Sequence, residues 1–138
     1  MNNVTEFKPK TPESEKITIN LGHIDLGQID LLANEGFYSN RTDFIRTAIR
    51  NQLERHSDAL KQTISRKQIK LGLHRFTRAD LEKLKVAGER LEIQVLGLAI
   101  IDDDVTPELA LQTIATIHVL GAFQASHAIK AALRDRLC

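Results

Sequence analysis

The chain has 138 residues, a formal net charge of +1 and 42% hydrophobic residues, which is the composition of a soluble globular protein and indicates no charged partner. Its only cysteine is Cys138, so no intrachain disulfide can form and nothing indicates an oxidising compartment. The longest strongly apolar run, residues 95–101, is far too short to span a bilayer. We therefore expect a soluble, cytoplasmic protein with no membrane partner.

The chain begins with a polar segment that is followed by a candidate β-strand. Residues 1–15 mix Pro, Glu and Lys without an apolar core, which excludes a secretory signal and predicts a disordered arm. The next segment, KITINL, alternates polar and apolar residues, as a half-buried strand does. No similar strand follows until the second half of the chain, so this strand lacks a neighbour within its own domain.

Two amphipathic helices are predicted to follow the strand. Asp25 is expected to cap the first helix, with Gln28 completing a capping box, and Gly36 to end it. Ser39 or Asn40 is expected to cap the second helix. The spacing of apolar residues predicts the buried stripes Ile29, Leu32 and Ala33 in the first helix and Phe44, Ile45, Ala48, Ile49 and Leu53 in the second.

A unit of residues 16–56 is too small to bury much apolar surface, and a lone strand leaves its backbone donors and acceptors unpaired. Antiparallel pairing with the same strand of a second copy solves both problems. Ile17, Ile19 and Leu21 of both chains then face the helices, and the polar side chains of both strands project outward together. The sequence therefore predicts a homodimer built on a two-stranded ribbon.

The outward face of this ribbon consists of Lys16, Thr18 and Asn20. A two-stranded ribbon fits the major groove of B-form DNA, where these side chain types can match base edges, at about 1–3 kcal/mol of discrimination for each good contact. The backbone amides around Asn40, Arg41 and Thr42, at the start of the second helix, are suited to a DNA phosphate. Strand side chains would read the sequence, and helix amides would fix the register.

This order of features resembles the ribbon-helix-helix family of bacterial DNA-binding regulators, the class that includes CopG, Arc and MetJ. The similarity covers residues 16–56 and rests on the strand KITINL, on Gly36, on the segment SNRTDFIR and on the apolar pattern that follows. It implies an obligate dimer that binds double-stranded DNA at the nucleoid and represses transcription, often of its own operon. The positions that match the family's base-reading strand are Lys16, Thr18 and Asn20, and those that match its phosphate-binding helix start are Ser39, Asn40, Arg41 and Thr42.

The second half of the chain is expected to form a separate domain. Residues 57–67 are rich in Lys and Arg and are interpreted as a basic linker. Within residues 68–138 the chain repeats itself at an offset of 24 (117 − 93), which places Ile93 over Ile117 and Gly97 over Gly121. The same offset aligns Ile69 with Ile93, although Gly72 is then one residue away from alignment with Gly97.

Each repeat is expected to consist of a strand, a turn and a helix. The predicted caps are Thr77, Thr106 with Pro107 at the first helical position, and Ser126. The fold class is therefore α+β, with a solenoid-like C-terminal β/α repeat of parallel strands and one helical layer. Since three repeats are about the minimum for a stable stack, this domain is expected to serve oligomerisation, up to a tetramer or higher, or regulation.

Neither a metal site nor an enzymatic site is expected. His74, His118, His127 and Cys138 lack close ligand spacing. The acids at 102–104 fit a turn better than a calcium loop. The sequence contains no Gly-rich phosphate loop, no nucleophile with a nearby His motif and no paired carboxylates in a recognisable context. We therefore expect no cofactor and no catalytic residue.

The sequence favours a sequence-specific DNA-binding transcriptional regulator, and the resemblance implies that it is a repressor. One alternative is an antitoxin that binds a toxin through its second half and regulates its own operon. Another is a metal-responsive regulator. A fragment of residues 57–138 that folds alone favours the regulator, a disordered fragment favours the antitoxin, and elemental analysis decides the metal hypothesis.

Overall fold

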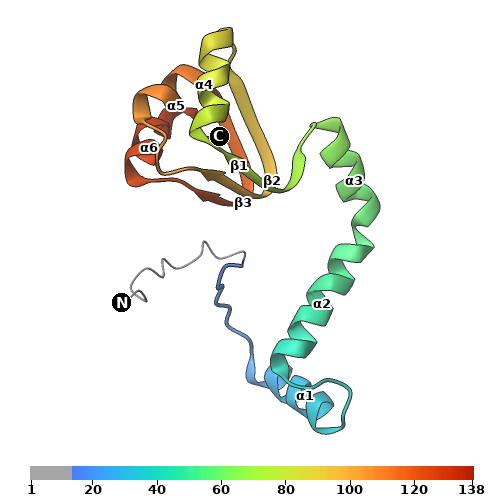
Figure 1. Ribbon diagram of the computed structural model, residues 1–138. Coiled ribbons are helices and arrows are strands. Elements are labelled where there is room, and N and C mark those ends of the chain that lie inside the picture. Colours follow the sequence, from blue (N-terminus) through green and yellow to red (C-terminus); the bar gives the residue numbers. More distant parts are fainter. Residues whose placement is uncertain (1–13) are drawn as a thin grey trace, which may run out of the picture. The chain divides into compact units, whose positions relative to one another are not determined.

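The computed structural model describes residues 14–138, so nearly all of the arm expected at residues 1–15 lies outside the described residues. Their elements are α1 (His23–Asn34), α2 (Arg41–Arg55), α3 (Ser57–Arg66), β1 (Lys70–Phe76), α4 (Arg78–Ala87), β2 (Leu91–Ile101), α5 (Pro107–Thr113), β3 (Ile114–Gln124), α6 (His127–Ala132) and a 3-10 helix (Arg134–Arg136) (Figure 1). The chain divides into two compact units, with the boundary between Ala59 and Leu60. None of the described helices is long and apolar enough to cross a membrane.

Helix α1 begins earlier than the sequence suggests. Its N-cap is Gly22, no side chain caps it, and Asp25 lies in the first turn. The expectation that Asp25 caps this helix is therefore wrong, because by that residue the backbone is already helical. The carboxylate of Asp25 still lies close to the positive end of the helix dipole, where a negative charge is favourable.

The end of α1 agrees with the sequence. Gly36 has a φ of 86°, in the left-handed region that favours glycine. The Gly36 amide donates to the Ala33 carbonyl, and the Phe37 amide donates to the Leu32 carbonyl, which is the Schellman arrangement. The chain then turns into α2 while the Tyr38 and Phe44 rings pack edge to face, 5.0 Å between centroids.

The second unit is built on a three-stranded sheet in the order β1-β2-β3, and both strand pairs are parallel. The expectation of parallel strands in a chain of mixed α and β structure is thus confirmed. The predicted caps are also observed, since Thr77, Thr106 and Ser126 each accept a hydrogen bond from the amide three residues on. Thr77 and Asp80 form a reciprocal capping box, and the Thr77 amide lowers the pKa of Asp80.

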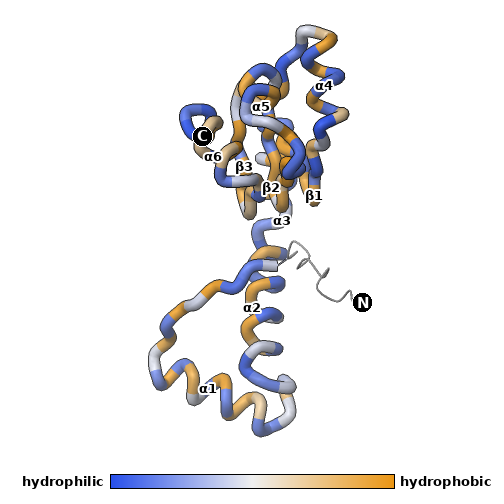
Figure 2. Tube along the Cα trace, turned by 60° about the vertical axis from the view of Figure 1, so that its left-hand side comes forward, coloured by the Kyte–Doolittle hydropathy of each residue, from blue (hydrophilic) through white to orange (hydrophobic). Residues whose placement is uncertain are grey.

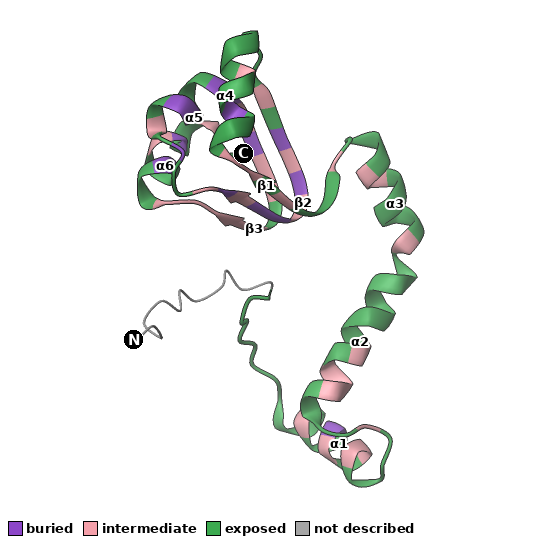
Figure 3. Ribbon diagram, in the orientation of Figure 1, coloured by how far each residue is buried: buried purple, intermediate pink, exposed green. Residues whose placement is uncertain are grey.

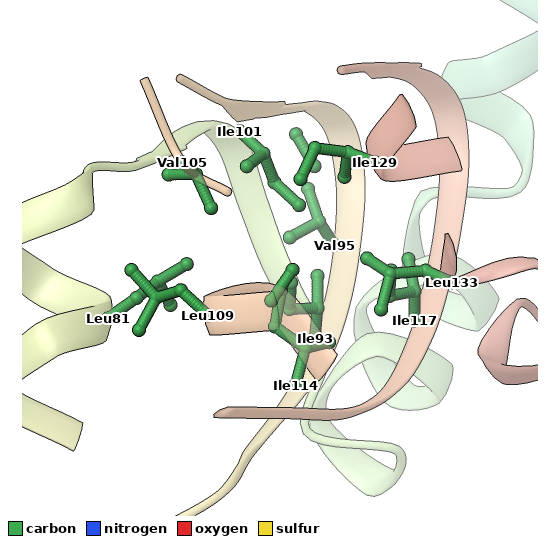
Figure 4. Packing of buried hydrophobic residues seen from close by; sticks show 12 residues of the cluster. Leu81, Ile93, Val95, Ile101, Val105, Leu109, Ile114, Ile117, Ile129 and Leu133 are labelled. Atoms are coloured by element: carbon green, nitrogen blue, oxygen red, sulfur yellow. The ribbon is translucent and has the colours of Figure 1, made fainter. Parts of the chain in front are cut away.

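The core of the second unit lies between the sheet and its helices (Figure 4). Parallel strands in sequential order require crossovers of one hand, which place all the connecting helices on the same face of the sheet. The buried residues are accordingly Leu81, Ile93, Val95, Ala99, Ile101, Val105, Leu109, Ala110, Ile114, Ile117, Ile129 and Leu133. The buried hydroxyl of Thr113 donates to the Leu109 carbonyl at 2.7 Å, so this polar group is satisfied.

A row of glycines crosses the sheet. Gly72 pairs with Gly97, and Gly97 pairs with Gly121. Their φ angles are 108°, 136° and 122°, which L side chains rarely adopt. A Cβ on Gly97 would lie 2.4 Å from the Gly72 carbonyl oxygen, and one on Gly121 would lie 2.1 Å from that of Gly97. Glycine is therefore required at the last two positions by contact with the neighbouring strand.

The glycine row also corrects the register expected for the first strand. Lys70 pairs with Val95, an offset of 25 (95 − 70), whereas Val95 pairs with Val119 at the expected 24 (119 − 95). The alignment of Ile69 with Ile93 is therefore wrong by one residue. The glycines determine the register because the backbone they allow must match between neighbouring strands.

The C-terminal segment is bound to the last strand. The Cys138 amide donates to the Ile117 carbonyl at 2.8 Å, and Leu137 forms an isolated parallel bridge with Ile117. The Arg136 guanidinium donates to the carbonyls of Leu111 and Ile114. The two bonds from Arg136 satisfy backbone carbonyls near the junction between α5 and β3.

We expect Gly97→Ala to destabilise the second unit by roughly 2–4 kcal/mol, because the substitution combines an unfavourable φ with a backbone clash. Gly72→Ala is the matched control, since Gly72 also has a positive φ but no atom lies within 4 Å of its added Cβ. It should cost about 1 kcal/mol from strain alone. Denaturant unfolding followed by circular dichroism measures both, and equal losses would refute the role of the close strand contact.

Candidate DNA interface

The segment before α1 is exposed along its whole length. Residues 15–22 belong to no helix or strand in the single chain. Ile17, Ile19 and Leu21 are 72%, 61% and 36% exposed, although alternating apolar residues are normally half-buried. The segment therefore has the pattern of a strand, and residues 14–138 of the single chain offer it no partner strand.

An apolar groove adjoins this segment in the first unit. Ile19 and Leu21 contribute to it from the segment, beside residues of α1 and α2. Its lining consists of Ile19, Leu21, Asp25, Gln28, Ile29, Leu32, Phe44, Ile45, Ala48 and Ile49. Most of the side chains expected to form the buried stripes of both helices thus line one groove, whereas Ala33 and Leu53 do not contribute to it.

The groove is only partly filled by the chain itself. Ile29 is the one buried residue of α1, and α2 has no buried residue at all (Figure 3). Hydrophobic residues nevertheless recur along both helices (Figure 2). Ile49 and Leu53, expected in the buried face of α2, remain exposed in the single chain. The first unit therefore presents an apolar surface that one chain leaves open.

The three side chains expected to read bases alternate along the segment with the apolar side chains. Lys16, Thr18 and Asn20 are all exposed, and none of them lines the groove. If Ile19 and Leu21 are turned toward the helices, the alternating geometry of an extended chain turns their neighbours away. A positive, a hydroxyl and an amide group are thus available on one side of the segment.

The start of α2 offers two backbone amides. Asn40 is the N-cap, and its side chain accepts from the Asp43 amide at 2.8 Å, so Asn40 rather than Ser39 is the cap. The Ser39 amide donates to the Asp43 carboxylate at 2.9 Å. Among the hydrogen bonds of the described residues, none uses the Arg41 or Thr42 amide. Those two groups remain free for an anion, as the first amides of a helix usually are.

The Arg41 side chain forms an ion pair with Asp30 of α1. Its Nε donates to Asp30 Oδ1 at 2.8 Å and its Nη2 to Oδ2 at 2.9 Å, a two-pronged geometry. The hydrogen bond from Arg41, reinforced by its charge, lowers the pKa of Asp30. The same contact raises the pKa of Arg41. The guanidinium is therefore ordered next to the helix start, although an acidic partner occupies it.

Sequence reasoning did not find Asp30 as part of this site. Asp30 and Arg41 are separated by the end of α1 and the turn into α2, so no helical spacing connects them. Their contact depends on the angle between the two helices, which Gly36 and the Tyr38–Phe44 pair help to set. The only signal in the sequence was a pair of opposite charges, one on each side of the turn between the two predicted helices.

The polar residues of the second unit form no comparable site. Asp102, in the acidic run at residues 102–104, accepts a hydrogen bond from Arg75 Nε at 2.5 Å. Across residues 14–138, no three His, Cys, Asp or Glu side chains lie close enough together to hold a metal ion. His74, His118, His127 and Cys138 are accordingly not brought together.

Comparison with known proteins gives one match, which covers most of the chain. The family described as the Ribbon-Helix-Helix transcriptional regulator family matches residues 12–130. This range includes the exposed segment, α1 and α2, and it continues through the parallel sheet. No curated protein and no solved structure matches significantly.

The Asp30–Arg41 pair predicts a measurable dependence on pH. Because the pKa of Asp30 is lowered in the folded chain, the pair stabilises the contact between α1 and α2 above the ordinary pKa of a carboxyl group. That contribution is lost as the pH falls through the lowered pKa. An NMR titration of the Asp30 carboxyl should give a higher pKa in Arg41→Gln than in the unchanged chain, whereas Arg46→Gln should leave it unchanged.

Proposed function

The chain belongs to the ribbon-helix-helix transcriptional regulator family, and on this premise we propose that it is a dimeric, sequence-specific DNA-binding repressor. It inserts a two-stranded β-ribbon, one strand from each chain, into the DNA major groove. The observation that carries this proposal is the exposed segment of residues 16–21, whose apolar side chains adjoin an open groove while its polar side chains face away.

The dimer follows from what the single chain leaves unsatisfied. A strand needs a neighbour for its backbone hydrogen bonds, and the first unit contains no other strand among its described residues. An identical strand, related by a twofold axis, supplies those bonds. It also brings a second groove, so that Ile17 and Ile19 of both chains are covered by the helices of the pair. The dimer is therefore obligate for the fold of this unit.

Base recognition is assigned to Lys16, Thr18 and Asn20. In the ribbon these residues from both chains form one raised surface of the width that the major groove accepts. Asn can make two hydrogen bonds to adenine, Lys can donate to guanine, and Thr can contact a thymine methyl group. The twofold axis of the protein requires an operator with matching symmetry, each half read by one set of three side chains.

Phosphate binding is assigned to the start of α2, at Ser39, Asn40, Arg41 and Thr42. The free amides of Arg41 and Thr42 supply directed donors at the positive end of the helix. The Arg41 guanidinium is close by, and a DNA phosphate offers it the same planar pair of oxygens that Asp30 now provides. These contacts carry no sequence information, and they fix how deeply the ribbon enters the groove.

The second unit supports a regulator rather than an antitoxin. An antitoxin tail that folds on its target has little core of its own, whereas residues 60–138 form a compact unit with a buried apolar cluster. We propose that this unit, an extended β/α repeat, serves oligomerisation or regulation. The 57–67 segment, predicted as a basic linker and occupied mostly by α3, joins it to the DNA-binding unit.

If the ribbon forms, every second backbone amide of residues 16–21 is hydrogen-bonded to the partner strand. We expect these amides to exchange with solvent at least roughly a hundredfold more slowly than unstructured amides, as measured by hydrogen exchange at neutral pH. Ile19→Asp should abolish this protection, because the charge cannot be buried on the helices. Val86→Asp, at an exposed apolar residue of α4, is the control. Absence of this protection in the unchanged chain would rule out the ribbon.

Specific binding should weaken when the outward side chains are shortened. We expect Thr18→Ala and Asn20→Ala each to cost about 1–3 kcal/mol of specific affinity, because each removes a base contact without touching the apolar face. Asn51→Ala, which removes an exposed amide from α2, should leave affinity unchanged. Gel shifts on an operator selected from random DNA measure this effect, and unchanged specificity in both variants would exclude the ribbon as the reader.

A further inference from the structure

The sheet of the second unit has one covered face and one bare face. Helices α4, α5 and α6 lie on the same side of the sheet (Figure 1). The crossovers between sequential parallel strands place α4 and α5 there, and Ile129 of α6 belongs to the same core cluster. The core residues of β2, namely Ile93, Val95, Ala99 and Ile101, alternate toward those helices. The residues between them therefore lie on the other face, which α4, α5 and α6 do not cover.

The bare face is apolar across all three strands. The strand register aligns Leu71 with Leu96 and Leu120 in one row, and Leu73 with Leu98 and Ala122 in the next. Leu71, Leu73 and Leu120 are 65%, 51% and 47% exposed. Leu98 is buried, yet it does not belong to the core cluster. These six residues, with Ile100 at the end of the face, are called the leucine face below.

The leucine face has an apolar centre and a polar rim. Gln94 and His118 are paired at one end of it, and Ile100 and Gln124 are paired at the other. Arg75 lies beside Ile100, and its charge is met by Asp102. An apolar centre without an unpaired charge, surrounded by polar groups, is the usual composition of a protein interface. Purely parallel sheets are, moreover, almost always covered on both faces.

We propose that the leucine face packs against the leucine face of a second copy of this chain. Two identical faces related by a twofold axis are automatically matched in size and polarity, and no unpaired charge at the centre opposes their approach. Two sheets packed in this way lie about 10 Å apart, with their leucines interleaved. The first 13 residues are a poor alternative cover, because Met1, Val4 and Phe7 are their only large apolar residues.

The size of the face agrees with a contact between chains that are already joined. At about 3.3 Å per residue and 4.8 Å between strands, seven residues across three strands cover roughly 20 by 15 Å. This is less than the area of a typical stable interface between free proteins, about 800 Å² per partner. Resting on the proposed ribbon dimer, however, the second copy is present at an effective concentration of about millimolar, which is sufficient for a small contact.

Cysteine labelling of the full chain tests whether the face is covered. Leu73→Cys and the control Val86→Cys, at a residue that is 89% exposed on α4, are each made in a Cys138→Ser background. Maleimide should modify Leu73→Cys at least tenfold more slowly than Val86→Cys. Equal rates of labelling would overturn the proposal, because the face would then be open to solvent.

Cross-linking tests whether the cover is a second copy. Leu96→Cys lies on the central strand, near any twofold axis through the face, so a short bis-maleimide should join two chains, whereas Val86→Cys should give no linked pair. Protection of Leu73→Cys without cross-linking of Leu96→Cys, or protection lost when residues 1–13 are removed, would overturn the proposal in favour of another cover. Circular dichroism of each variant confirms the fold.

A gel shift on the same proteins separates this inference from the proposed function. A slowly labelled face in a chain that binds no DNA would uphold the face contact and refute the DNA-binding role. A rapidly labelled face in a chain that does bind DNA would refute the face contact alone.

Discussion

The unpaired backbone of residues 16–21 is the constraint on which the function of the first unit depends. Extended backbone in a folded protein must find hydrogen-bond partners, and the described residues of this unit contain no strand that could provide them. The same segment contributes Ile19 and Leu21 to an apolar groove that the chain leaves open. In the proposed dimer, a second chain satisfies both requirements at once. The proposed base-reading surface is a consequence of that pairing, because the side chains that do not pack are brought together on the outside.

The second unit is governed by a different constraint, the close approach of backbones along the glycine row. Gly97 and Gly121 allow neighbouring strands a conformation that no other residue could share without a clash. Their alignment fixes the register, and the register in turn fixes which residues lie under the helices and which form the leucine face. One row of small residues thus determines both the core of this unit and its uncovered surface.

Features that depend on a few neighbouring residues could be predicted from the sequence, and features that depend on distant contacts could not. Asn40, Thr77, Thr106 and Ser126 cap helices because a side chain oxygen and an amide three residues on suffice. Asp25 fitted the same local rule, but the helix began earlier, at a glycine without a side chain. The one-residue shift of β1 required knowing that glycines align across strands.

Contacts between side chains that are far apart in the sequence could not be predicted either, and one of them lies at the candidate site. The Asp30–Arg41 pair links two helices through a turn, so neither residue indicates the other. Its presence changes how the start of α2 should be understood. If Arg41 binds a phosphate as proposed, DNA must compete with the Asp30 carboxylate for the same edge of the guanidinium. In that proposal the competition would weaken non-specific binding more than specific binding, since only a correctly seated ribbon would bring a phosphate close enough to replace Asp30.

The two units are connected by the same need for a second copy. The family match extends through both units, so the parallel sheet is part of the family's own architecture rather than an unrelated addition. Among the described residues, the extended segment of the first unit has no partner strand, and Leu71, Leu73 and Leu120 on one face of the sheet are exposed. If both needs are met by one pair of chains, closing the leucine faces restrains the ribbon from separating. If they are met by different pairs, the same faces join dimers and place several ribbons along one DNA duplex. In the first arrangement, opening the leucine face would act on DNA binding through the stability of one ribbon, and in the second it would act through the number of ribbons held together.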